Sequence, residues 1–404
     1  MGSDLNQGAP LTPLESSLPP KGRLTFVIYK MSEGGAQRHL SNLVNFLSKR
    51  GWSITVLTFD DGSSPSFYKL HLSVQRIPLS IMRQQKGFLR SLLIPFLRPW
   101  ILRTAILKNK PDIVIPFIDL TNILTLISTI GLEIPVLVAE MTHPKYHKMG
   151  KLWGCVRAWI YRRASCVVVQ TEIGLSFFSP EIQCRSKIIP NPVIAPVIVP
   201  ENCSLDSHSK SLKDAKTLIA MGRLSTEKGF DLLLKAFVKV VSSCPDWKLI
   251  VWGEGDQRKK LEDLSEELGL KEKVSFPGIT HKPYEKMKES DLFVLSSQFE
   301  GFPNVLCEVM ACGLPVVSFN CPSGPGTIIR DGYDGILVPP GDVEELAVTL
   351  VKVMNNTDLR ESLSKNAGEI IHRFSVDKVV RMWEELFFEY SKNDQDKLNS
   401  LRIT

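Results

Sequence analysis

The chain has 404 residues, 43% of them hydrophobic and 23% charged, with a formal net charge of +6. This length suffices for two domains of about 150–200 residues each, and the apolar fraction is ordinary for a globular protein. No apolar run reaches the roughly eighteen residues of a membrane-spanning helix, because Arg98 and Arg103 interrupt the best candidate.

The charge is divided unevenly along the chain. Residues 1–200 carry 23 Lys and Arg against 11 Asp and Glu, a charge of +12, and residues 201–404 carry 26 against 32, a charge of −6. This split predicts different partners for the two halves. We expect no nucleic acid among them, because no recognition motif is present. The scattered cysteines form neither a Cys-x-x-Cys pair nor a metal-spaced cluster, which indicates reduced core residues and a cytoplasmic protein.

The first half alternates between strand and helix patterns. Residues 1–20 predict a disordered tail. Residues 23–29 predict a strand that runs through Gly34 and Gly35 into a helix ending near Arg50. Two glycines at a strand-to-helix turn let the backbone approach a phosphate closely. Further strands are predicted at 52–59, 113–117, 135–140 and 166–171, helices at 122–131 and 152–163, and a linker at 196–216.

The second half repeats the alternation. A strand at 217–222 leads through a loop with Arg223 and Lys228 into a helix ending at Ser243. Later strands are predicted at 248–252, 274–276, 291–297, 315–319 and 336–338, and helices at 343–354, 358–373 and 382–390. This order predicts the α/β class, with two doubly wound domains.

Two carboxylates lie eight residues apart in the stretch from Glu300 to Gly313. Pro303 breaks the preceding strand, and Asn304 is a favourable N-cap for a helix at 305–312 that carries Glu308. Ligands of open α/β sheets bind at the carboxyl ends of strands, and helix N-termini attract phosphate. The spacing therefore suits a nucleotide-sugar. The alternative is an ordinary capped helix with two solvated glutamates.

This stretch resembles the Glu-x7-Glu signature of the retaining glycosyltransferases of family 4, which have two Rossmann-like domains, the GT-B fold. The segments at Gly34-Gly35 and Gly222 to Gly229 are similar to other motifs of that family, and the resemblance covers residues 23–383. It implies transfer of a sugar from a nucleotide-sugar, with UDP-GalNAc, UDP-GlcNAc, UDP-Gal or UDP-Glc as the expected donors. It also implies an acceptor-side domain at 21–195, a donor-binding domain at 217–375, a segment at 376–404 that crosses back, and a site in the cleft between the domains.

The resemblance also implies roles for individual residues. It assigns catalytic roles to Glu300, Arg223, Lys228 and His143, and acceptor-side positions to Glu140, His143 and Lys145. Donor binding is expected from Gly34, Gly35, Arg223, Lys228, Gly253, Ile279, Glu300, Gly301, Phe302, Pro303, Asn304, Val305 and Glu308. Two cations already supply charge for the leaving diphosphate, so we expect no metal ion and no cofactor beyond the donor.

A basic apolar stretch remains. Residues 62–111 contain nine Lys and Arg but no Asp or Glu, and apolar side chains stand between the cations of residues 83–110. This composition predicts a helix in a membrane interface, either kinked or split into two helices by Pro95 and Pro99, on a peripheral enzyme at the inner face. The alternative is a core helix whose arginines reach solvent.

The expected acceptor is a lipid-linked saccharide. Three other activities stay open: transfer to a soluble sugar or protein, epimerisation or hydrolysis of a nucleotide-sugar on the same fold, and nucleotide binding by a non-catalytic subunit. The oligomeric state is not predicted.

Overall fold

The computed structural model describes residues 21–81, 88–141, 150–194 and 216–391. The predicted tail and nearly all of the predicted linker lie outside these ranges. Packing divides the chain into two compact units, residues 1–137 with 387–404, and residues 138–386. The domain boundaries inferred from the sequence stay a prediction.

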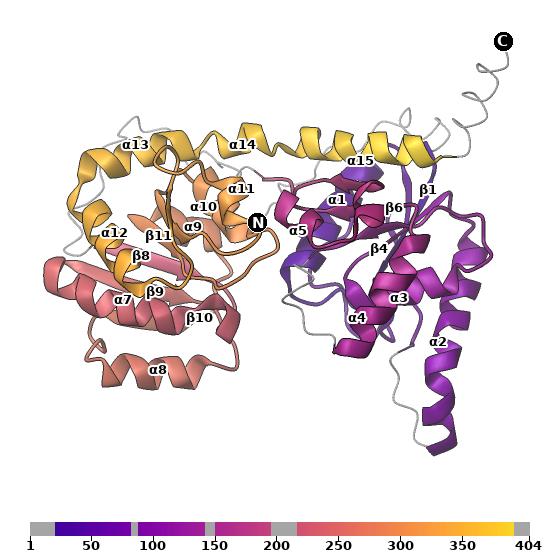
Figure 1. The fold of residues 1–404 in the computed structure, drawn as a ribbon, viewed down its shortest axis with the longest axis horizontal. Coiled ribbons are helices and arrows are strands. Elements are labelled where there is room, and N and C mark those ends of the chain that lie inside the picture. The colour runs from indigo at the N-terminus through magenta and orange to yellow at the C-terminus, as the bar shows by residue number, and fades with distance from the viewer. Residues whose placement is uncertain (1–20, 82–87, 142–149, 195–215, 392–404) are drawn as a thin grey trace, which may run out of the picture. The chain divides into compact units, whose positions relative to one another are not determined.

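In the first unit, parallel strands form a sheet in the order β3-β2-β1-β4 (Figure 1). Its elements are β1 (Arg23–Ile28), α1 (Gly35–Lys49), β2 (Ser53–Thr58), β3 (Gln75–Pro78), α2 (Phe88–Asn109), β4 (Ile113–Pro116) and α3 (Asp119–Ser128). The sequence did not predict β3, whose Gln-Arg-Ile-Pro segment is short and has no fully buried residue. It is a strand because β2 pairs with it.

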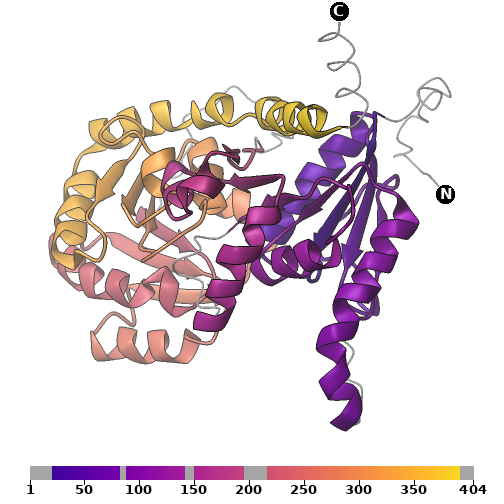
Figure 2. The same cartoon turned by 45° about the vertical axis from the view of Figure 1, so that its right-hand side comes forward.

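Of the two alternatives predicted for α2, the split into two helices is wrong, and the kink stays a prediction. One helix runs from Phe88 to Asn109, through Pro95 and Pro99, although each proline removes a backbone donor. Its C-terminal half is held by packing, since Leu102 and Ile106 are fully buried. Figures 1 and 2 show the other end of α2 standing away from the sheet of its unit. Among the described residues, no helix is both long and apolar enough to cross a bilayer.

In the second unit, parallel strands form a larger sheet in the order β10-β9-β8-β11-β12-β13, and a smaller sheet has the order β5-β6-β7. The strands are β5 (Leu137–Ala139), β6 (Cys166–Val169), β7 (Ser186–Ile188), β8 (Lys216–Met221), β9 (Trp247–Trp252), β10 (Val274–Gly278), β11 (Leu292–Leu295), β12 (Val316–Phe319) and β13 (Ile336–Val338).

The α-helices between these strands are α4 (Lys151–Ile160), α5 (Glu172–Ser176), α6 (Pro180–Gln183), α7 (Phe230–Ser243), α8 (Arg258–Glu267), α9 (Pro283–Lys288), α10 (Asn304–Ala311), α11 (Pro325–Ile328), α12 (Val343–Asn355), α13 (Thr357–Ala367) and α14 (Ile370–Arg373). Short 3-10 turns cover Tyr161–Arg163 and Thr226–Lys228.

The larger sheet is covered on both faces. Along β8, Leu218 and Ala220 belong to a hydrophobic cluster with α7 and α12, while Ile219 and Met221 belong to a second cluster with α10. Successive side chains of a strand point to opposite faces, so one strand supplies both cores. The predicted doubly wound α/β architecture is confirmed.

The last helix, α15 (Val376–Tyr390), begins earlier than the predicted residue 382. Ser375 ends the preceding segment, and its hydroxyl accepts the backbone N–H of Lys378 at 3.3 Å. The final residues of α15 belong to the first unit. There the rings of Phe387 and Phe388 lie 5.4 and 5.5 Å from the ring of Trp52.

A buried histidine on α1 gives the first unit a pH-dependent stability. His39 is 4% exposed, its ring lies 5.9 Å from that of Phe117, and its Nδ1 has no hydrogen-bond partner within the described part of the chain. Burial therefore lowers the pKa of His39 from 6.5 to about 4. Because the unfolded chain takes up this proton at higher pH, the stabilisation is complete above about pH 6.5 and is lost as the pH falls through 4.

We expect His39→Leu to remove this pH dependence. Between pH 7 and pH 4.5, the wild type should lose about 2–3 kcal/mol of unfolding free energy beyond the loss in the variant. Urea unfolding followed by circular dichroism at both pH values measures the difference. Parallel losses in the two proteins would contradict this account of His39.

Candidate functional site

Lys228 and Glu300 form the centre of the candidate site in the second unit. Lys228 follows β8 and Glu300 follows β11, which are neighbours in the sheet. The Lys228 Nζ donates to Glu300 Oε1 at 2.7 Å, and the Ser297 hydroxyl donates to the same oxygen at 2.7 Å. The two charged side chains are 21% and 11% exposed. Two residues separated by 72 positions thus meet at the carboxyl edge of the sheet. The sequence placed each of them after a strand but did not predict this ion pair.

Gly229 lets the two loops approach each other. Its φ is 61°, in the left-handed region, and a Cβ there would overlap the carbonyl oxygen of Ser296. Three hydrogen bonds join the two loops. Ser296 Oγ donates to the Lys228 carbonyl at 2.9 Å. Gln298 donates through its backbone N–H to the Glu227 carbonyl at 2.8 Å and through Nε2 to the Thr226 carbonyl at 3.3 Å. The backbone contact therefore fixes where the Lys228 side chain can reach.

Asn304 does not cap its helix as predicted. Pro303 occupies the cap position of α10 and Asn304 is its first helical residue. The Asn304 side chain is engaged elsewhere, because its Oδ1 accepts a hydrogen bond from Asn191 Nδ2 at 2.7 Å. Asn191 in turn accepts a hydrogen bond from Gln170 Nε2. The Pro-Asn-Pro turn at 190–192 thus fixes the start of α10, a role that its sequence did not reveal.

The residues around the start of α10 differ in what they can touch. Phe302 is 6% exposed and its ring packs edge-on against Phe374 at 5.6 Å, so it supports the loop from the core. Pro303 is also buried, whereas Val305 and Glu308 are half-buried. Glu308 lies in the second turn of α10, as expected. The donor contacts expected of these residues stay predictions.

A second segment packs on the Glu300 loop. The Ser323 hydroxyl lies 3.3 Å from the Gly301 carbonyl oxygen, to which it donates, and 2.8 Å from the Thr171 hydroxyl. Gly324 has φ 122°, and a Cβ there would meet the ring of Pro303 at 2.5 Å. These contacts hold Gly301, in the loop before α10, against the segment that precedes α11. The sequence did not predict a contact between this glycine-rich segment and the Glu300 loop.

The other donor-side glycine has a steric role. A Cβ on Gly253 would overlap the Gly222 carbonyl oxygen, so the loop after β9 packs directly on the loop that carries Arg223. The Arg223 side chain is exposed, and Ile279 is 51% exposed at the end of β10. Both are therefore accessible to a ligand at the carboxyl edge of the sheet.

Burial disfavours the thiolate form of Cys307, Cys312 and Cys321. Burial raises the pKa of Cys321 to about 12, with a further contribution from the Glu300 carboxylate, and burial raises the pKa of Cys312 to about 11. The pKa of Cys307 is raised as well, mainly by burial. A protonated thiol is a weak nucleophile and a poor metal ligand. These cysteines fill space, as the sequence indicated.

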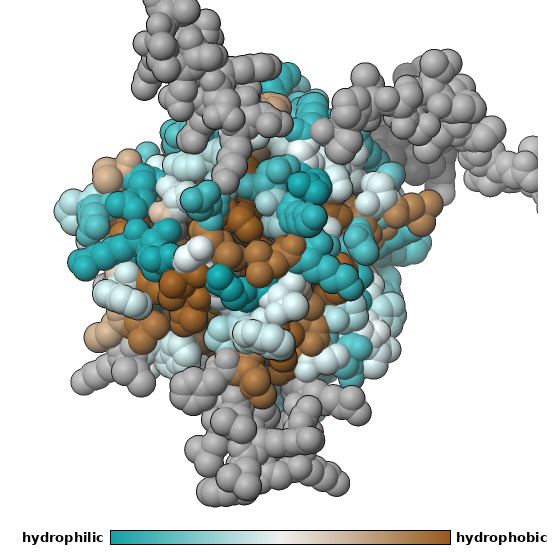
Figure 3. All heavy atoms as spheres, turned by 90° about the vertical axis from the view of Figure 1, so that its right-hand side faces the viewer, coloured by the Kyte–Doolittle hydropathy of each residue, from teal (hydrophilic) through white to brown (hydrophobic). Residues whose placement is uncertain are grey.

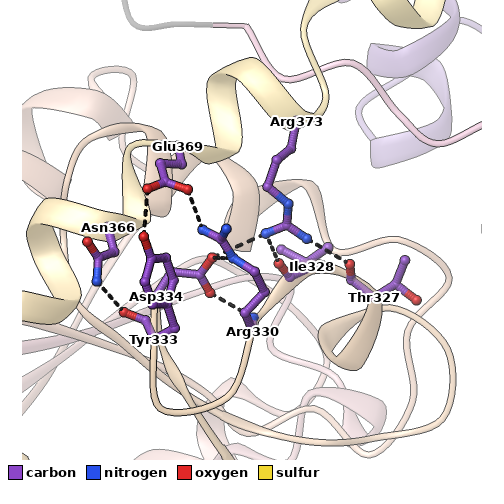
Figure 4. A network of polar contacts seen from close by, with 8 residues as sticks. All are labelled: Thr327, Ile328, Arg330, Tyr333, Asp334, Asn366, Glu369 and Arg373. Carbon is purple, nitrogen blue, oxygen red and sulfur yellow. Dashed lines mark hydrogen bonds and ion pairs between the residues drawn. The ribbon is translucent and has the colours of Figure 1, made fainter.

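A charged network anchors α11 (Figure 4). The Asp334 carboxylate is fully buried, and it accepts hydrogen bonds from Arg330 Nε at 2.6 Å and from Arg373 Nη1 at 3.2 Å. Arg373 also donates to the carbonyl oxygens of Ile328 and Thr327 at 2.7 and 3.3 Å. Glu369, which is more exposed, accepts from Arg330 at 2.8 Å. The network therefore ties the segment that holds Gly301 to α14.

In the first unit, Gly34 and Gly35 lie at the start of the long helix α1. Gly34 is the cap residue with φ 154° and ψ 159°, a conformation that essentially only glycine adopts. Its N–H lies 3.5 Å from the Tyr68 hydroxyl. The start of a helix suits an anion, and the predicted phosphate-binding role of these glycines stays a prediction.

Of the predicted acceptor-side residues, the structure describes Glu140. Glu140 is 3% exposed and accepts a hydrogen bond from the Tyr161 hydroxyl at 2.7 Å. His143 and Lys145 lie outside the described residues. Their roles, like those of the other site residues, stay predictions.

Two models of known protein families match this chain. Residues 33–194 match the model described as Glycosyltransferase Family 4, and residues 205–369 match the model described as Glycosyl transferases group 1. The chain belongs to the family 4 glycosyltransferases. The recognised family, the enzyme class and the GT-B fold are thereby confirmed.

Solved structures and curated relatives agree with this glycosyltransferase assignment. The structure superposes on sucrose-phosphate synthase from Thermosynechococcus elongatus with a TM-score of 0.77 and 19% identity, covering 91% of this chain and 99% of that one. Anabaena HepE in complex with UDP and glucose gives a TM-score of 0.74 and 21% identity, covering 90% and 99%. At these identities the likeness shows the fold alone.

Two relatives are nearer in sequence. An alpha-1,4-N-acetyl-D-galactosaminyltransferase of Campylobacter jejuni, named for a substrate linked through PP to undecaprenol, is 28% identical over 91% of this chain and 98% of its own length. An exopolysaccharide phosphotransferase of Streptomyces coelicolor is 36% identical over 63% of this chain. The chain spans 27% of that relative's length.

We expect the Asp334 network to govern the stability of the second unit of this glycosyltransferase. Asp334→Asn removes the buried carboxylate that pairs with both Arg330 and Arg373, so unfolding should cost about 3–5 kcal/mol less. Glu369→Gln, which alters the more exposed partner of Arg330, serves as the matched control and should change little. Urea unfolding of the wild type and the two variants measures their free energies of unfolding. Equal losses in both variants would contradict the distinction between buried and exposed partners.

Proposed function

We propose that this glycosyltransferase moves a sugar from a UDP-sugar to a lipid-linked saccharide, with retention at the anomeric carbon. The Lys228–Glu300 pair carries the proposal, because it places a cation and a sugar-binding carboxylate together at the carboxyl edge of a parallel sheet. The fold neighbour crystallised with UDP and glucose supports UDP as the nucleotide. The relative named for an undecaprenol-linked substrate supports the acceptor class.

The donor is held mainly by charge. Arg223 is exposed at the end of β8, and Lys228 reaches the same edge from the next turn, so both can meet a diphosphate. The backbone N–H groups at the start of α10, and Gly34 with Gly35, supply further donors. As the bond to the sugar breaks, negative charge grows on the diphosphate, and preorganised cations stabilise that charge. Glu308 accepts hydrogen bonds from the ribose hydroxyls.

Glu300 positions the sugar rather than attacking it. Its Oε1 already accepts two hydrogen bonds, from Lys228 and Ser297, which leaves the other oxygen for a sugar hydroxyl. The acceptor hydroxyl attacks the face that the diphosphate leaves. The bond from C1 to the phosphate oxygen breaks, the bond from C1 to the acceptor oxygen forms, and the acceptor proton passes to the departing diphosphate. His143, with Glu140 and Lys145, belongs to the acceptor side of this proposal.

The acceptor proposal also rests on α2. Its described half has two faces: Leu102 and Ile106 are buried, whereas Leu97, Trp100 and Leu107 are 49%, 65% and 46% exposed. Figure 3 views the side on which α2 lies in Figure 1 and shows hydrophobic side chains gathered there. An exposed Trp among leucines, next to cations, suits the interface of an anionic membrane. We therefore place the enzyme peripherally on the inner face of the membrane.

One cation of α2 has a structural partner instead. Arg103 Nη1 donates to the carbonyl oxygens of Ser128 and Ile130 at 3.0 and 2.6 Å, where α3 ends. Arg103 thus caps a neighbouring helix, so lipid headgroups are left to other cations such as Arg98 and Lys108, which are exposed.

Removing a proposed diphosphate ligand should slow transfer. Arg223→Ala and Lys228→Ala should each raise the barrier by about 2–4 kcal/mol, by analogy with losing an oxyanion donor, and Glu308→Ala should raise the donor KM more than it lowers kcat. The measurement is release of UDP and elongated product from each UDP-sugar with a polyprenyl-diphosphate-linked N-acetylhexosamine. Lys239→Ala, an exposed lysine on α7, is the control.

Three results would count against this proposal. Unchanged turnover in all three variants would refute the site assignment. Free sugar or isomerised donor in place of elongated acceptor would indicate a hydrolase or an epimerase. We also propose that transfer needs no metal, so complete loss of activity in EDTA would refute that part.

Membrane attachment has a separate test. Wild-type enzyme should float with anionic phosphatidylglycerol liposomes at low salt, and an Arg98→Glu/Trp100→Ser variant should stay in the soluble fraction. Val348→Ser alters a side chain on α12 that is 61% exposed and serves as the matched control. If the wild type fails to float, the membrane proposal is wrong, and a soluble sugar or protein acceptor is favoured.

A further inference from the structure

The segment after β1 and the loop between β2 and β3 present aromatic side chains at the carboxyl edge of the first sheet. Tyr29 directly follows β1 and is 46% exposed, and Phe67 in the loop is 60% exposed. Tyr68 is half-buried beside it, with ring centroids 5.0 Å apart. We call Tyr29, Phe67 and Tyr68 the aromatic shelf. None of the donor-side roles proposed above uses these three residues.

The aromatic shelf is held in place from below. The ring of Tyr29 rests edge-on against Phe59 at 6.1 Å, and Phe59 is 4% exposed. The Phe67 N–H donates to the Met31 carbonyl at 2.9 Å, which ties the loop to the segment after β1. These contacts set the backbone from which the Tyr29 and Phe67 rings project.

A buried ion pair braces the rest of the loop. Arg76 Nη2 lies 2.9 and 2.8 Å from the two carboxylate oxygens of Asp60, and Arg76 Nη1 donates to the Ser64 carbonyl at 3.0 Å. Asp60 also accepts from Thr58 Oγ1 and from the Gly62 N–H. These hydrogen bonds fix the loop backbone in a position that leaves the Phe67 ring exposed. Burial in the hydrophobic core therefore does not account for this aromatic side chain. A rigid exposed aromatic ring is typical of binding surfaces.

The position of the aromatic shelf selects its occupant. The Tyr68 hydroxyl lies 3.5 Å from the Gly34 nitrogen, so the aromatic shelf adjoins the glycine turn that we propose for the donor diphosphate. A pyranose ring has an apolar face of C–H groups with partial positive charge, and an aromatic face carries partial negative charge. Ligand sites combine such apolar surfaces with a few polar groups that fix orientation, here the Tyr68 hydroxyl.

We propose that the aromatic shelf binds a sugar ring of the acceptor and thereby selects saccharide acceptors. This inference rests on the proposed function, because it takes transfer to a saccharide as given. The sugar lies across Phe67 and Tyr29, and the Tyr68 hydroxyl orients it next to the glycine turn.

Phe67→Ala and Tyr29→Ala test the aromatic shelf with little risk to folding, since Phe67 is 60% exposed and Tyr29 is 46% exposed. With a polyprenyl-diphosphate-linked N-acetylhexosamine as acceptor, each should raise the acceptor KM at least tenfold. The donor KM, and the UDP Kd by calorimetry, should stay within twofold of wild type.

Leu72→Ala is the matched control. Leu72 is fully exposed on the same loop, beside His71, whose N–H is held by Asn45 in the later part of α1. It should leave all three constants unchanged. An unchanged acceptor KM in both shelf variants would overturn the proposal while leaving transfer intact. Loss of liposome flotation with an unchanged acceptor KM would assign Phe67 to the membrane and also overturn it.

A direct binding measurement separates this proposal from the proposed function. Saturation-transfer NMR with methyl N-acetyl-α-D-galactosaminide should give ring-proton signals with the wild type and Leu72→Ala, and none with Phe67→Ala/Tyr29→Ala. If the wild type shows these signals but no transfer, the aromatic shelf stands and the proposed function fails. If the wild type shows no signal, the aromatic shelf is refuted.

Discussion

The ion pair between Lys228 and Glu300 is the constraint on which the donor-side geometry depends. Both side chains are largely withdrawn from water, so each needs the other as long as no ligand is present. Their meeting requires the loops after β8 and β11 to touch at backbone level, which only a glycine at position 229 permits. The proposed diphosphate would share a cation that the fold has already placed, with little reorganisation.

Around this ion pair, glycines allow the loops of the second unit to pack closely against one another. Gly253 packs on Gly222, and Gly324 packs on Pro303, so the loops after β8, β9, β11 and β12 converge at one edge of the sheet. The charged groups that hold these loops lie behind the edge. Arg373 donates hydrogen bonds to carbonyl oxygens of α11, and the buried Asp334 carboxylate accepts a hydrogen bond from Arg373. Support and binding are thereby carried by different residues.

The first unit presents two surfaces of different chemistry. At the carboxyl edge of its sheet, the glycine turn and the aromatic shelf offer hydrogen-bond donors and flat rings. Along α2, one face is buried and the other exposes Leu97 and Trp100. A lipid-linked saccharide needs both chemistries, a ring-binding surface for the sugar and an interfacial surface near the lipid. The basic charge of residues 1–200 agrees with this division, since anionic lipid and diphosphate both attract cations.

The sequence by itself determined the alternation of strands and helices, the doubly wound class, and the placement of Lys228 and Glu300 at strand ends, because periodicity and turn residues are local properties. Tertiary structure alone decided which distant residues and strands contact each other. Asn304 binds Asn191 rather than its own helix, Arg103 caps α3, α2 continues through two prolines, and β3 forms only because β2 pairs with it. Each of these depends on a residue distant in the chain, and packing energy there outweighs the local preference that a sequence pattern reports.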